Sequence, residues 1–532
     1  MSDTTKKGLF LGSDGKNLMF TFILVSSLFL LWGVCNGMID VMDKHFQEEL
    51  GLTKSQSAWV QFAHYLGYFL MSMPAGVLAS KLGYKGGIIT GLLIVAAGGF
   101  WFIPATHIAQ FWAFLLGVCV IASGLTFLET IANPYTTVLG DPRYAATRIN
   151  LAQSCNGVGW IFGPIIGGMF FYSKNAAGVS TGSQTLYIPY VIVAAVVIVI
   201  AIIFYFANVP DIKAEDDYHL DESDAGSDAR NHARNDAAPV PEREFSRGLV
   251  YLLLWLNSAV IVFSCGMILW VILSTVGTKE ATTNRILAIG GVAALAAAAA
   301  VLGPVAKRIS HHSIWSHPHF SAATLAQFFY VAAQAGIFSF FINYMTAELP
   351  VIPHSWTTGM LQSWFETGKT GVLHLSDRGA SNMASLGLFC FLTGRFTGAG
   401  ILKKFSAHKV LGLYGAVNVA VCLLVFLKLG WFSVICVFAS YFFMSIMFPT
   451  IFALGIFGLG ARAKKASSFI VMAIMGGAIL PKLMGAVADK WDMSRGFAVP
   501  MVCFSLVALY GFSWSKFSKA DSMSGVKIAG GH

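Results

Sequence analysis

The stretch Thr126-Phe-Leu-Glu-Thr-Ile-Ala-Asn-Pro-Tyr-Thr-Thr-Val-Leu-Gly140 places one acidic residue, Glu129, inside an apolar run that begins near Phe111. An ionised carboxylate at the centre of a bilayer costs about 3 kcal/mol on insertion scales, so such a residue usually faces a cavity or relays protons. The alternative is a glutamate that a neighbouring helix holds for packing. We interpret Glu129 as a candidate proton carrier on a membrane helix.

The composition of the whole chain supports a membrane protein. Apolar residues make up 56% of the sequence, charged residues only 11%, and the mean hydropathy is +0.67. These values lie outside the range of soluble domains. The 8 cysteines all fall within apolar runs and form no disulfide framework or metal-binding spacing. The sequence therefore predicts an all-α polytopic membrane protein.

Fourteen apolar runs are long enough to span a bilayer. They begin near Leu18, Ala58, Gly86, Gln110, Ile149 and Tyr187, then near Gly248 and Ile286, and finally near Phe320, Asn382, Val410, Trp431, Ala466 and Phe497. Between the sixth and seventh runs the chain is polar and mostly acidic, which is typical of a solvated linker.

This pattern predicts two six-helix bundles with an inserted helix pair. The predicted segments are an N-terminal tail (1–17), a first bundle (18–209), an acidic linker (210–247), the inserted pair (248–306), a loop (307–319), a second bundle (320–517) and a C-terminal tail (518–532).

The distribution of lysine and arginine predicts the orientation. If the N-terminus is cytoplasmic, every second loop is cytoplasmic too, and these loops are rich in basic residues, as the positive-inside rule requires. Examples are Lys307 with Arg308, and Arg462 with Lys464 and Lys465. We therefore expect both termini in the cytoplasm. The net charge of +9 then reflects orientation, which argues against nucleic-acid binding.

An internal repeat relates the two predicted bundles. Glycine and proline residues recur at identical offsets after Arg148 (Gly159, Pro164, Gly168) and after Lys465 (Gly476, Pro481, Gly485). Parallel repeats of six helices about a central cavity are the architecture of the major facilitator fold. We expect that fold here, with fourteen transmembrane helices.

Few ionisable residues lie within the predicted spans, and we treat them as candidates. Besides Glu129, they are Asp40 near the end of the first span, which is a second candidate for proton coupling, Arg395 in the eighth and Lys482 in the eleventh. Arg395 precedes Lys403 and Lys404, so we place it near the cytoplasmic end of its helix, at an inner gate. We expect Lys482 to extend outward to the interface.

Amide side chains with apolar neighbours are a second group of candidates. An amide offers both donors and acceptors to a polyhydroxylated ligand, and leaving it unpaired in hydrocarbon is costly. The candidates are Asn36, Asn133, Gln153, Asn156, Gln327 and Gln334, with Tyr330 as an aromatic that could stack on a sugar ring. No phosphate-binding loop, metal-ligand set or catalytic nucleophile accompanies them, so we do not expect an enzyme.

Several motifs together resemble the fucose–proton symporter family of the major facilitator superfamily. They are Leu31-Trp-Gly-Val-Cys-Asn-Gly-Met-Ile-Asp40, Leu128-Glu-Thr-Ile-Ala-Asn-Pro-Tyr135, Asn150-Leu-Ala-Gln153, Leu325-Ala-Gln-Phe-Phe-Tyr330, Gly394-Arg-Phe-Thr-Gly398 and Ser467-Ser-Phe-Ile-Val-Met472. The resemblance extends over both predicted bundles.

The resemblance implies roles for individual residues. The family's acids on helices 1 and 4 map onto Asp40, linked to sugar binding, and Glu129, linked to proton transfer. Its helix 5 and helix 7 glutamines map onto Gln153 and onto Gln327 and Gln334. The stretch 76–85 resembles the superfamily's inner-gate motif through Gly76, Lys81 and Lys85, although Ser80 stands where an aspartate is usual.

We therefore expect a proton-coupled symporter that imports a hexose, a deoxyhexose or an N-acetylhexosamine by alternating access. It would act as a monomer in a bacterial cytoplasmic (inner) membrane, with no cofactor besides the co-transported proton. Sodium coupling, export of an amphipathic compound, and a sugar sensor or receptor without net transport are the alternatives.

Overall fold

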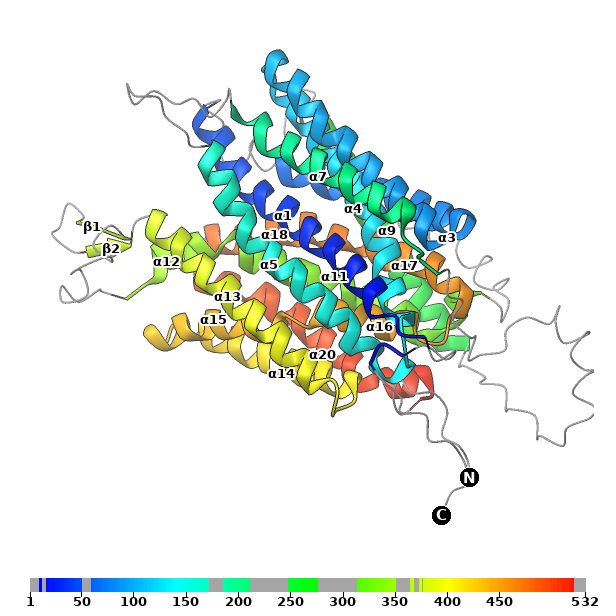
Figure 1. The fold of residues 1–532 in the computed structure, drawn as a ribbon. Helices are drawn as coiled ribbons and strands as arrows, with labels where there is room; N and C mark the ends of the chain where they lie inside the picture. The colour runs from blue at the N-terminus through cyan, green and yellow to red at the C-terminus, as the bar shows by residue number, and fades with distance from the viewer. Residues whose placement is uncertain are drawn as a thin grey trace, which may run out of the picture.

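Helices that run the length of one elongated bundle dominate the computed structural model of the chain (Figure 1). The structure describes residues 9–11, 16–49, 59–171, 185–210, 247–275, 313–350, 364–367, 373–375 and 377–520. The start of α1 and the end of α20 lie at the same end of the bundle, and the strands β1 and β2 lie at the other (Figure 1).

The first set of helices comprises α1 (Met19–Glu49), α3 (Trp59–Ile108), α4 (Phe111–Val138), α5 (Ala145–Phe171) and α7 (Tyr187–Phe206), with the short η1 (Pro142–Tyr144) before α5. α3 contains two of the predicted spans. Its halves meet at Gly83, whose φ of 70° and ψ of −175° break the helix. Glycine has no Cβ and adopts this positive φ without strain.

The second set follows η2 (Ile314–Ser316). Its helices are α11 (Pro318–Ser339), α12 (Phe341–Glu348), α13 (Asp377–Ile401), α14 (Ala407–Phe426), α15 (Trp431–Met444), α16 (Met447–Ile456), α17 (Ala463–Met472), α18 (Gly476–Lys490), α19 (Met493–Gly496) and α20 (Ala498–Ser518), with η5 (Gly460–Arg462) and η6 (Ala473–Met475) flanking α17. Between α12 and α13, β1 (Phe365–Thr367) pairs antiparallel with β2 (Leu373–Leu375).

The predicted spans are confirmed wherever the structure describes them. Ten helices of the described residues are long and apolar enough to cross a membrane, and the α11–α12 pair, bent by 48°, makes an eleventh. The first half of α3 and the whole of α5 are also helical, as predicted, but they are not among these candidate spans. The second span of the inserted pair, 286–305, and most of the acidic linker lie outside the described residues.

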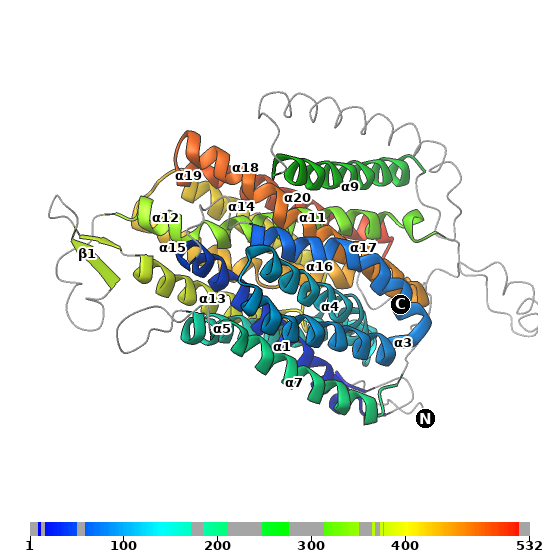
Figure 2. The same ribbon diagram turned by 90° about the horizontal axis from the view of Figure 1, so that it is seen from above.

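The first helix of the inserted pair is α9 (Arg247–Thr275), which lies along the outside of the bundle beside α11 and α18 (Figure 2). Asn257 of α9 donates to the backbone oxygen of Ser321 at 2.8 Å and accepts a hydrogen bond from the Thr324 hydroxyl. Lipid tails are as apolar as the helix surfaces, so the hydrophobic effect does not drive membrane helices together. Interhelical hydrogen bonds of this kind therefore help to hold them together. α9 is therefore fixed to the second set of helices.

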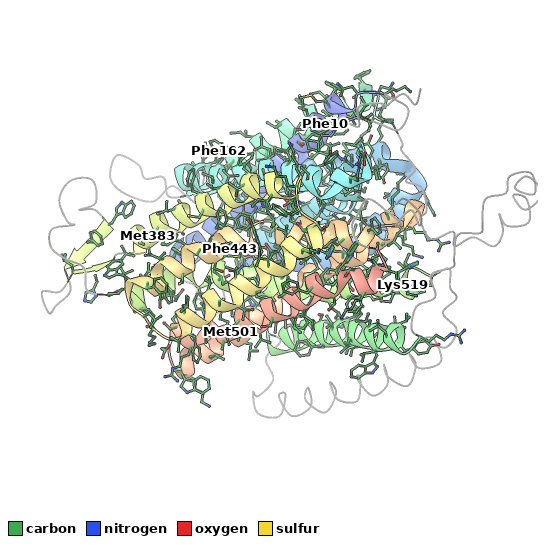
Figure 3. All side chains as sticks on the ribbon, turned by 90° about the horizontal axis from the view of Figure 1, so that it is seen from below. Phe10, Phe162, Met383, Phe443, Met501 and Lys519 are labelled. Atoms are coloured by element: carbon green, nitrogen blue, oxygen red, sulfur yellow. The ribbon has the colours of Figure 1, made fainter. Side chains whose placement is uncertain are left out.

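The outer surface of the bundle is apolar. Side chains such as Phe162 project outward from the helices (Figure 3), and half of the Phe162 surface is exposed (50%). An apolar outer surface around a more polar interior is what a bilayer imposes, because charged groups are expensive in hydrocarbon.

Close helix packing brings α1 and α5 together beside the interior. A Cβ at Gly33 would lie 2.1 Å from the Asn156 backbone oxygen, and one at Gly159 would lie 2.3 Å from that of Leu30. Only glycine allows this approach. The contact sets the polar residues of α5 against α1, next to the gap between the two sets of helices.

Arg148 connects the end of α4 to the start of the chain. Its fully buried guanidinium donates to the backbone oxygens of Thr136 at 3.0 Å, Asp141 at 2.8 Å and Leu9 at 3.2 Å. Further bonds reach the backbone oxygens of Thr137 and Gly140. The last carbonyl groups of a helix have no hydrogen-bond donors within the helix. At the end of α4, Arg148 supplies these donors.

We predict that Arg148→Met destabilises the protein by about 3 kcal/mol, because buried carbonyl groups lose a charged donor. The midpoint of thermal unfolding in detergent would fall. The matched control is Arg143→Met in the same loop, whose exposed side chain forms a salt bridge with Asp141 and whose loss should leave the midpoint unchanged. Equal midpoints for the two variants would contradict the role assigned to Arg148.

Candidate functional site

A cavity of about 100 Å³ lies between the two sets of helices, enough for several water molecules. From the first set, its wall contains Trp32, Asn36, Ile39, Gln61, His64, Tyr65, Tyr68, Glu129, Gln153, Asn156 and Trp160. From the second set, it contains Val331, Gln334, Ala335, Phe338, Phe391, Arg395, Phe448 and Ile474. Most of this wall consists of polar and aromatic side chains.

Glu129 reaches the cavity from the middle of α4 and is 1% exposed. Among the described residues, neither carboxyl oxygen has a hydrogen-bond partner. The Tyr68 hydroxyl interacts electrostatically with this carboxyl. A buried carboxyl without partners is costly when charged, so Glu129 suits a site that gains and loses a proton.

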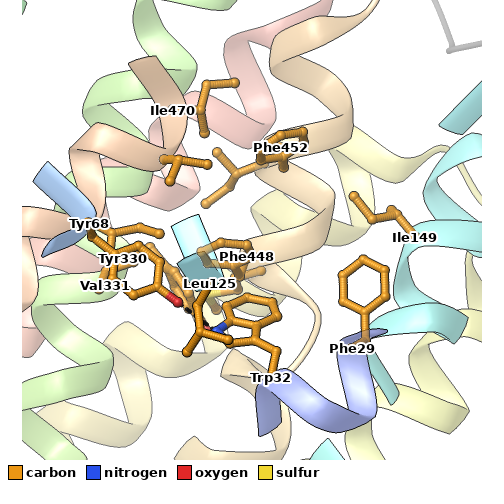
Figure 4. Close-up of a cluster of buried hydrophobic side chains, with 14 of the residues drawn as sticks. Phe29, Trp32, Tyr68, Leu125, Ile149, Tyr330, Val331, Phe448, Phe452 and Ile470 are labelled. Carbon is orange, nitrogen blue, oxygen red and sulfur yellow. Dashed lines mark hydrogen bonds between the residues drawn. The ribbon is translucent and has the colours of Figure 1, made fainter. Parts of the chain in front are cut away.

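Trp32 and Tyr68 form a hydrogen-bonded pair next to Glu129. The indole Nε1 of Trp32 donates to the Tyr68 hydroxyl oxygen at 2.7 Å, the bond drawn in Figure 4. Phe448, from the second set, lies across the cavity with its ring centre 6.2 Å from that of Trp32. Aromatic side chains from both sets of helices thus face each other here.

Arg395 joins the two sets of helices at the cavity wall. Its Nη1 donates to Asn156 Oδ1 at 3.2 Å, with Gln153 Oε1 at 3.4 Å and the Gln153 backbone oxygen also in contact. Its Nε donates to the Ser445 backbone oxygen at 3.0 Å, and its guanidinium lies 4.5 Å from the Phe391 ring centre.

The structure places Arg395 at the cavity wall, whereas the sequence predicted a position at an inner gate. Arg395 is eight residues before Lys403, and at 1.5 Å per residue it lies about 12 Å further along the helix axis. That distance places it beside the cavity instead of at the end of the bundle. It is 3% exposed, and no carboxylate contacts it among the described residues.

The predicted amides occupy different depths. Asn36, Gln153, Asn156 and Gln334 line the cavity. Asn133 lies behind the wall, where its Oδ1 accepts a hydrogen bond from Gln153 Nε2 at 3.0 Å. Gln327 is fully buried away from the wall, and both of its amide atoms lack partners.

Two further predicted residues are not part of the described wall. Tyr330 is fully buried within a cluster of hydrophobic side chains (Figure 4) and donates its hydroxyl to the Met444 backbone oxygen at 3.0 Å, so the structure gives it a packing position. Asp40 lies within α1, but its side chain is outside the described residues.

Contacts between the two sets close the cavity towards the end that carries Gly83. A Cβ at Gly76 would lie 2.7 Å from the Ser468 Cβ, so α3 and α17 touch there. Lys464 lies 4.1 Å above the Tyr84 ring centre. Asn150 Nδ2 donates to Thr450 Oγ1 at 3.1 Å.

Gly76, which the sequence predicted at an inner gate, thus lies at this contact between the two sets. Lys85 donates to the Ala207 backbone oxygen at 2.9 Å, within the first set, and Lys81 is exposed. Among the described residues that connect the two sets here, Lys464, Ser468, Asn150 and Thr450 were not predicted as gate residues.

The sequence analysis also missed His64 and Tyr68. Both lie on the first half of α3 and line the cavity. A histidine inside a predicted membrane span is a signal that the scan for ionisable residues could have used. Among the described residues, no group of three or more His, Cys, Asp or Glu side chains could hold a metal ion.

Comparisons with known proteins agree with this architecture. Residues 21–360 match the model of the Major Facilitator Superfamily. The chain is 31% identical over 518 residues to the L-fucose-proton symporter of Escherichia coli (strain K12), covering 93% of each chain. It is 26% identical over 505 residues to the glucose/galactose transporter of Brucella abortus (strain 2308), covering 95% of this chain and 96% of the relative.

Solved structures give the same result. The crystal structure of the transporter FucP in the outward conformation aligns with a TM-score of 0.63 at 30% identity, over 93% of this chain and 99% of that one. The proton:xylose symporter XylE shares the fold alone, with a TM-score of 0.58 at 12% identity, over 95% of this chain and 98% of that one. The chain is thus a multi-pass membrane transporter, not an enzyme, and belongs to the Major Facilitator Superfamily, in the family of the L-fucose-proton symporters.

Proposed function

We propose that this protein is a proton-coupled sugar symporter that imports a hexose, deoxyhexose or N-acetylhexosamine by alternating access. The observation that carries the proposal is the unpartnered Glu129 carboxyl at a cavity lined by amides and aromatic rings, between two sets of helices. Relatives named as fucose and as glucose/galactose transporters support the sugar as the substrate class.

The cavity wall suits a polyhydroxylated ligand. Asn36, Gln153, Asn156 and Gln334 offer donors and acceptors, and a hydrogen-bonding site of this kind rejects analogues that lack the matching hydroxyl. Trp32 and Trp160 offer flat apolar faces for the C–H side of a sugar ring. Asp40 belongs to the same proposal as the sugar-binding acid of α1.

Glu129 is the proposed proton carrier. The ionised carboxylate has no partner in the closed interior, so the loaded transporter turns more easily when Glu129 is protonated. One proton moving down a membrane potential of about 100 mV supplies about 2.3 kcal/mol. That energy supports roughly fiftyfold accumulation of a neutral sugar.

Alternating access requires the contacts at the closed end to break and reform. The bonds of Arg395 to Gln153 and Asn156 lie directly at the cavity, so a sugar that competes for these amides changes the contact between the two sets of helices. Differential contacts of this kind are what a shift between two states requires. We further propose that the chain acts as a monomer in the inner membrane of a bacterium. Both of its termini would then lie in the cytoplasm.

We predict that adding the transported sugar makes the medium outside lightly buffered, right-side-out vesicles more alkaline, because each sugar molecule enters with a proton. Fucose, galactose, glucose, mannose, fructose and N-acetylglucosamine would be added one at a time, with a protonophore as the control. Uptake that needs sodium and leaves the pH unchanged would contradict proton coupling. Binding without exchange of labelled sugar would instead indicate a sensor.

We predict that Glu129→Gln abolishes uphill accumulation and leaves counterflow of labelled sugar within about twofold of the wild type. The amide keeps the shape of the side chain but cannot carry a proton. Glu348→Gln is the matched control. Glu348 forms a 3.2 Å ion pair with Lys428, and neither residue lines the cavity. This variant should preserve both activities. Accumulation by the Glu129 variant would move the proton-carrier role to another residue.

A further inference from the structure

Lys464 on α17 and Tyr84 on α3 make a cation–ring contact across the closed end of the bundle, where α17 packs against α3 (Figure 2). The Lys464 Nζ lies 4.1 Å from the centre of the Tyr84 ring, well inside the range of about 6 Å over which a ring attracts a cation. Among the described residues, this is the one cation–ring contact that joins the two sets of helices. The others pair Arg143 with Tyr144, Arg395 with Phe391, Lys490 with Trp491 and Arg495 with Phe426.

The first set of helices holds Tyr84 in place. Tyr84 directly follows Gly83, at the break in α3, and is 3% exposed. Its ring centre lies 4.3 Å from that of Tyr135 on α4. The Tyr135 hydroxyl in turn donates to the backbone oxygen of Pro210, shortly after α7, at 2.6 Å. The ring that contacts Lys464 is therefore braced by α4 and by the chain that follows α7.

α17 presents one side to the first set of helices. Ser467 and Ser468 lie three and four residues after Lys464, so the three side chains share one side of the helix. The Ser467 hydroxyl donates to the Thr130 backbone oxygen at 2.7 Å, and Ser468 meets Gly76. The two serines make neutral contacts, and Lys464 adds a charged one beside them.

A contact between an ammonium group and an aromatic ring suits a closure that must reopen. The attraction is stronger where the ring is shielded from water, as the Tyr84 ring is. Lys464 is only partly buried, so its ammonium group exchanges the ring for water when α17 moves away from α3. Separation then leaves no unsolvated charge inside the bundle, in contrast to the breaking of a buried ion pair.

We propose that the Lys464–Tyr84 contact is a latch that holds this end of the transporter closed and limits how often it opens. Neither residue lines the cavity, so both act as positioning residues and not as sugar ligands. The latch favours the closed state because the contact is made in that state alone, which is what a bias between two states requires. This inference rests on the alternating access proposed above and names a contact that sets its balance.

The test measures how often the closed end opens in the full chain, without sugar or a proton gradient. Ser468 is 1% exposed at the contact with α3, so Ser468→Cys places a thiol that a water-soluble maleimide reaches only when this end opens. The rate of labelling of this parent chain then reports the open fraction. The same labelling of the chain without the substitution gives the background from its 8 native cysteines.

We expect Lys464→Met and Tyr84→Leu, each added to the parent chain, to raise the labelling rate roughly fivefold. That factor lies within the range of about two- to thirtyfold that a cation–ring contact supplies. The double variant should label no faster than either single variant, because both changes remove the same contact. Tyr84→Phe keeps the aromatic face and should label within about twofold of the parent.

Lys490→Met is the matched control. Lys490 is exposed and lies 4.6 Å from the Trp491 ring centre, a contact within the second set. Its loss should leave the labelling rate of the parent chain unchanged. Elution as a single monodisperse peak in detergent checks that each variant folds.

The outcomes separate the latch from the proposed function. If only one of Lys464→Met and Tyr84→Leu speeds labelling, if their effects multiply in the double variant, or if Tyr84→Phe labels as fast as Tyr84→Leu, the latch is overturned. A thiol that reacts only after denaturation in every variant would contradict alternating access, and the latch with it. If no sugar changes the pH while the expected labelling pattern holds, proton symport fails and the latch stands.

Discussion

The carboxyl of Glu129 is the constraint around which the interior is arranged. In hydrocarbon, neither water nor a counter-ion can solvate it, so it needs a cavity. The cavity in turn requires two sets of helices that meet without filling the space between them. Its wall collects the polar side chains of α1, α3, α5, α11 and α13, while the outer surface stays apolar.

The contacts between the two sets of helices are unequal along the bundle. Towards the end that carries Gly83, α3 and α17 touch at Gly76 and Ser468, and Asn150 bonds to Thr450. At the cavity, the contact is made through Arg395 and two amides. Small residues and neutral hydrogen bonds can separate and reform at modest cost, which is compatible with a movable interface.

Arg395 combines two properties that are seldom found together. It is buried and charged, yet its partners in the described residues are carbonyl and amide oxygens and an aromatic face. Several charge-assisted hydrogen bonds offset part of its desolvation. The bonds to Gln153 and Asn156 cross between the two sets, so Arg395 links the cavity wall of one set to the other.

The sequence by itself determined the membrane class, the order of the helices and the depth of Glu129, because hydropathy and the cost of a buried charge are local properties of the chain. Which polar residues share the cavity was decided only by the tertiary structure. Gln327 and Gln334 are seven residues apart and so lie on nearly the same face of α11, but about 10 Å apart along its axis. Only Gln334 reaches the cavity. The length of the cavity along the helices depends on how the two sets pack together. No sequence pattern within one helix contains that information.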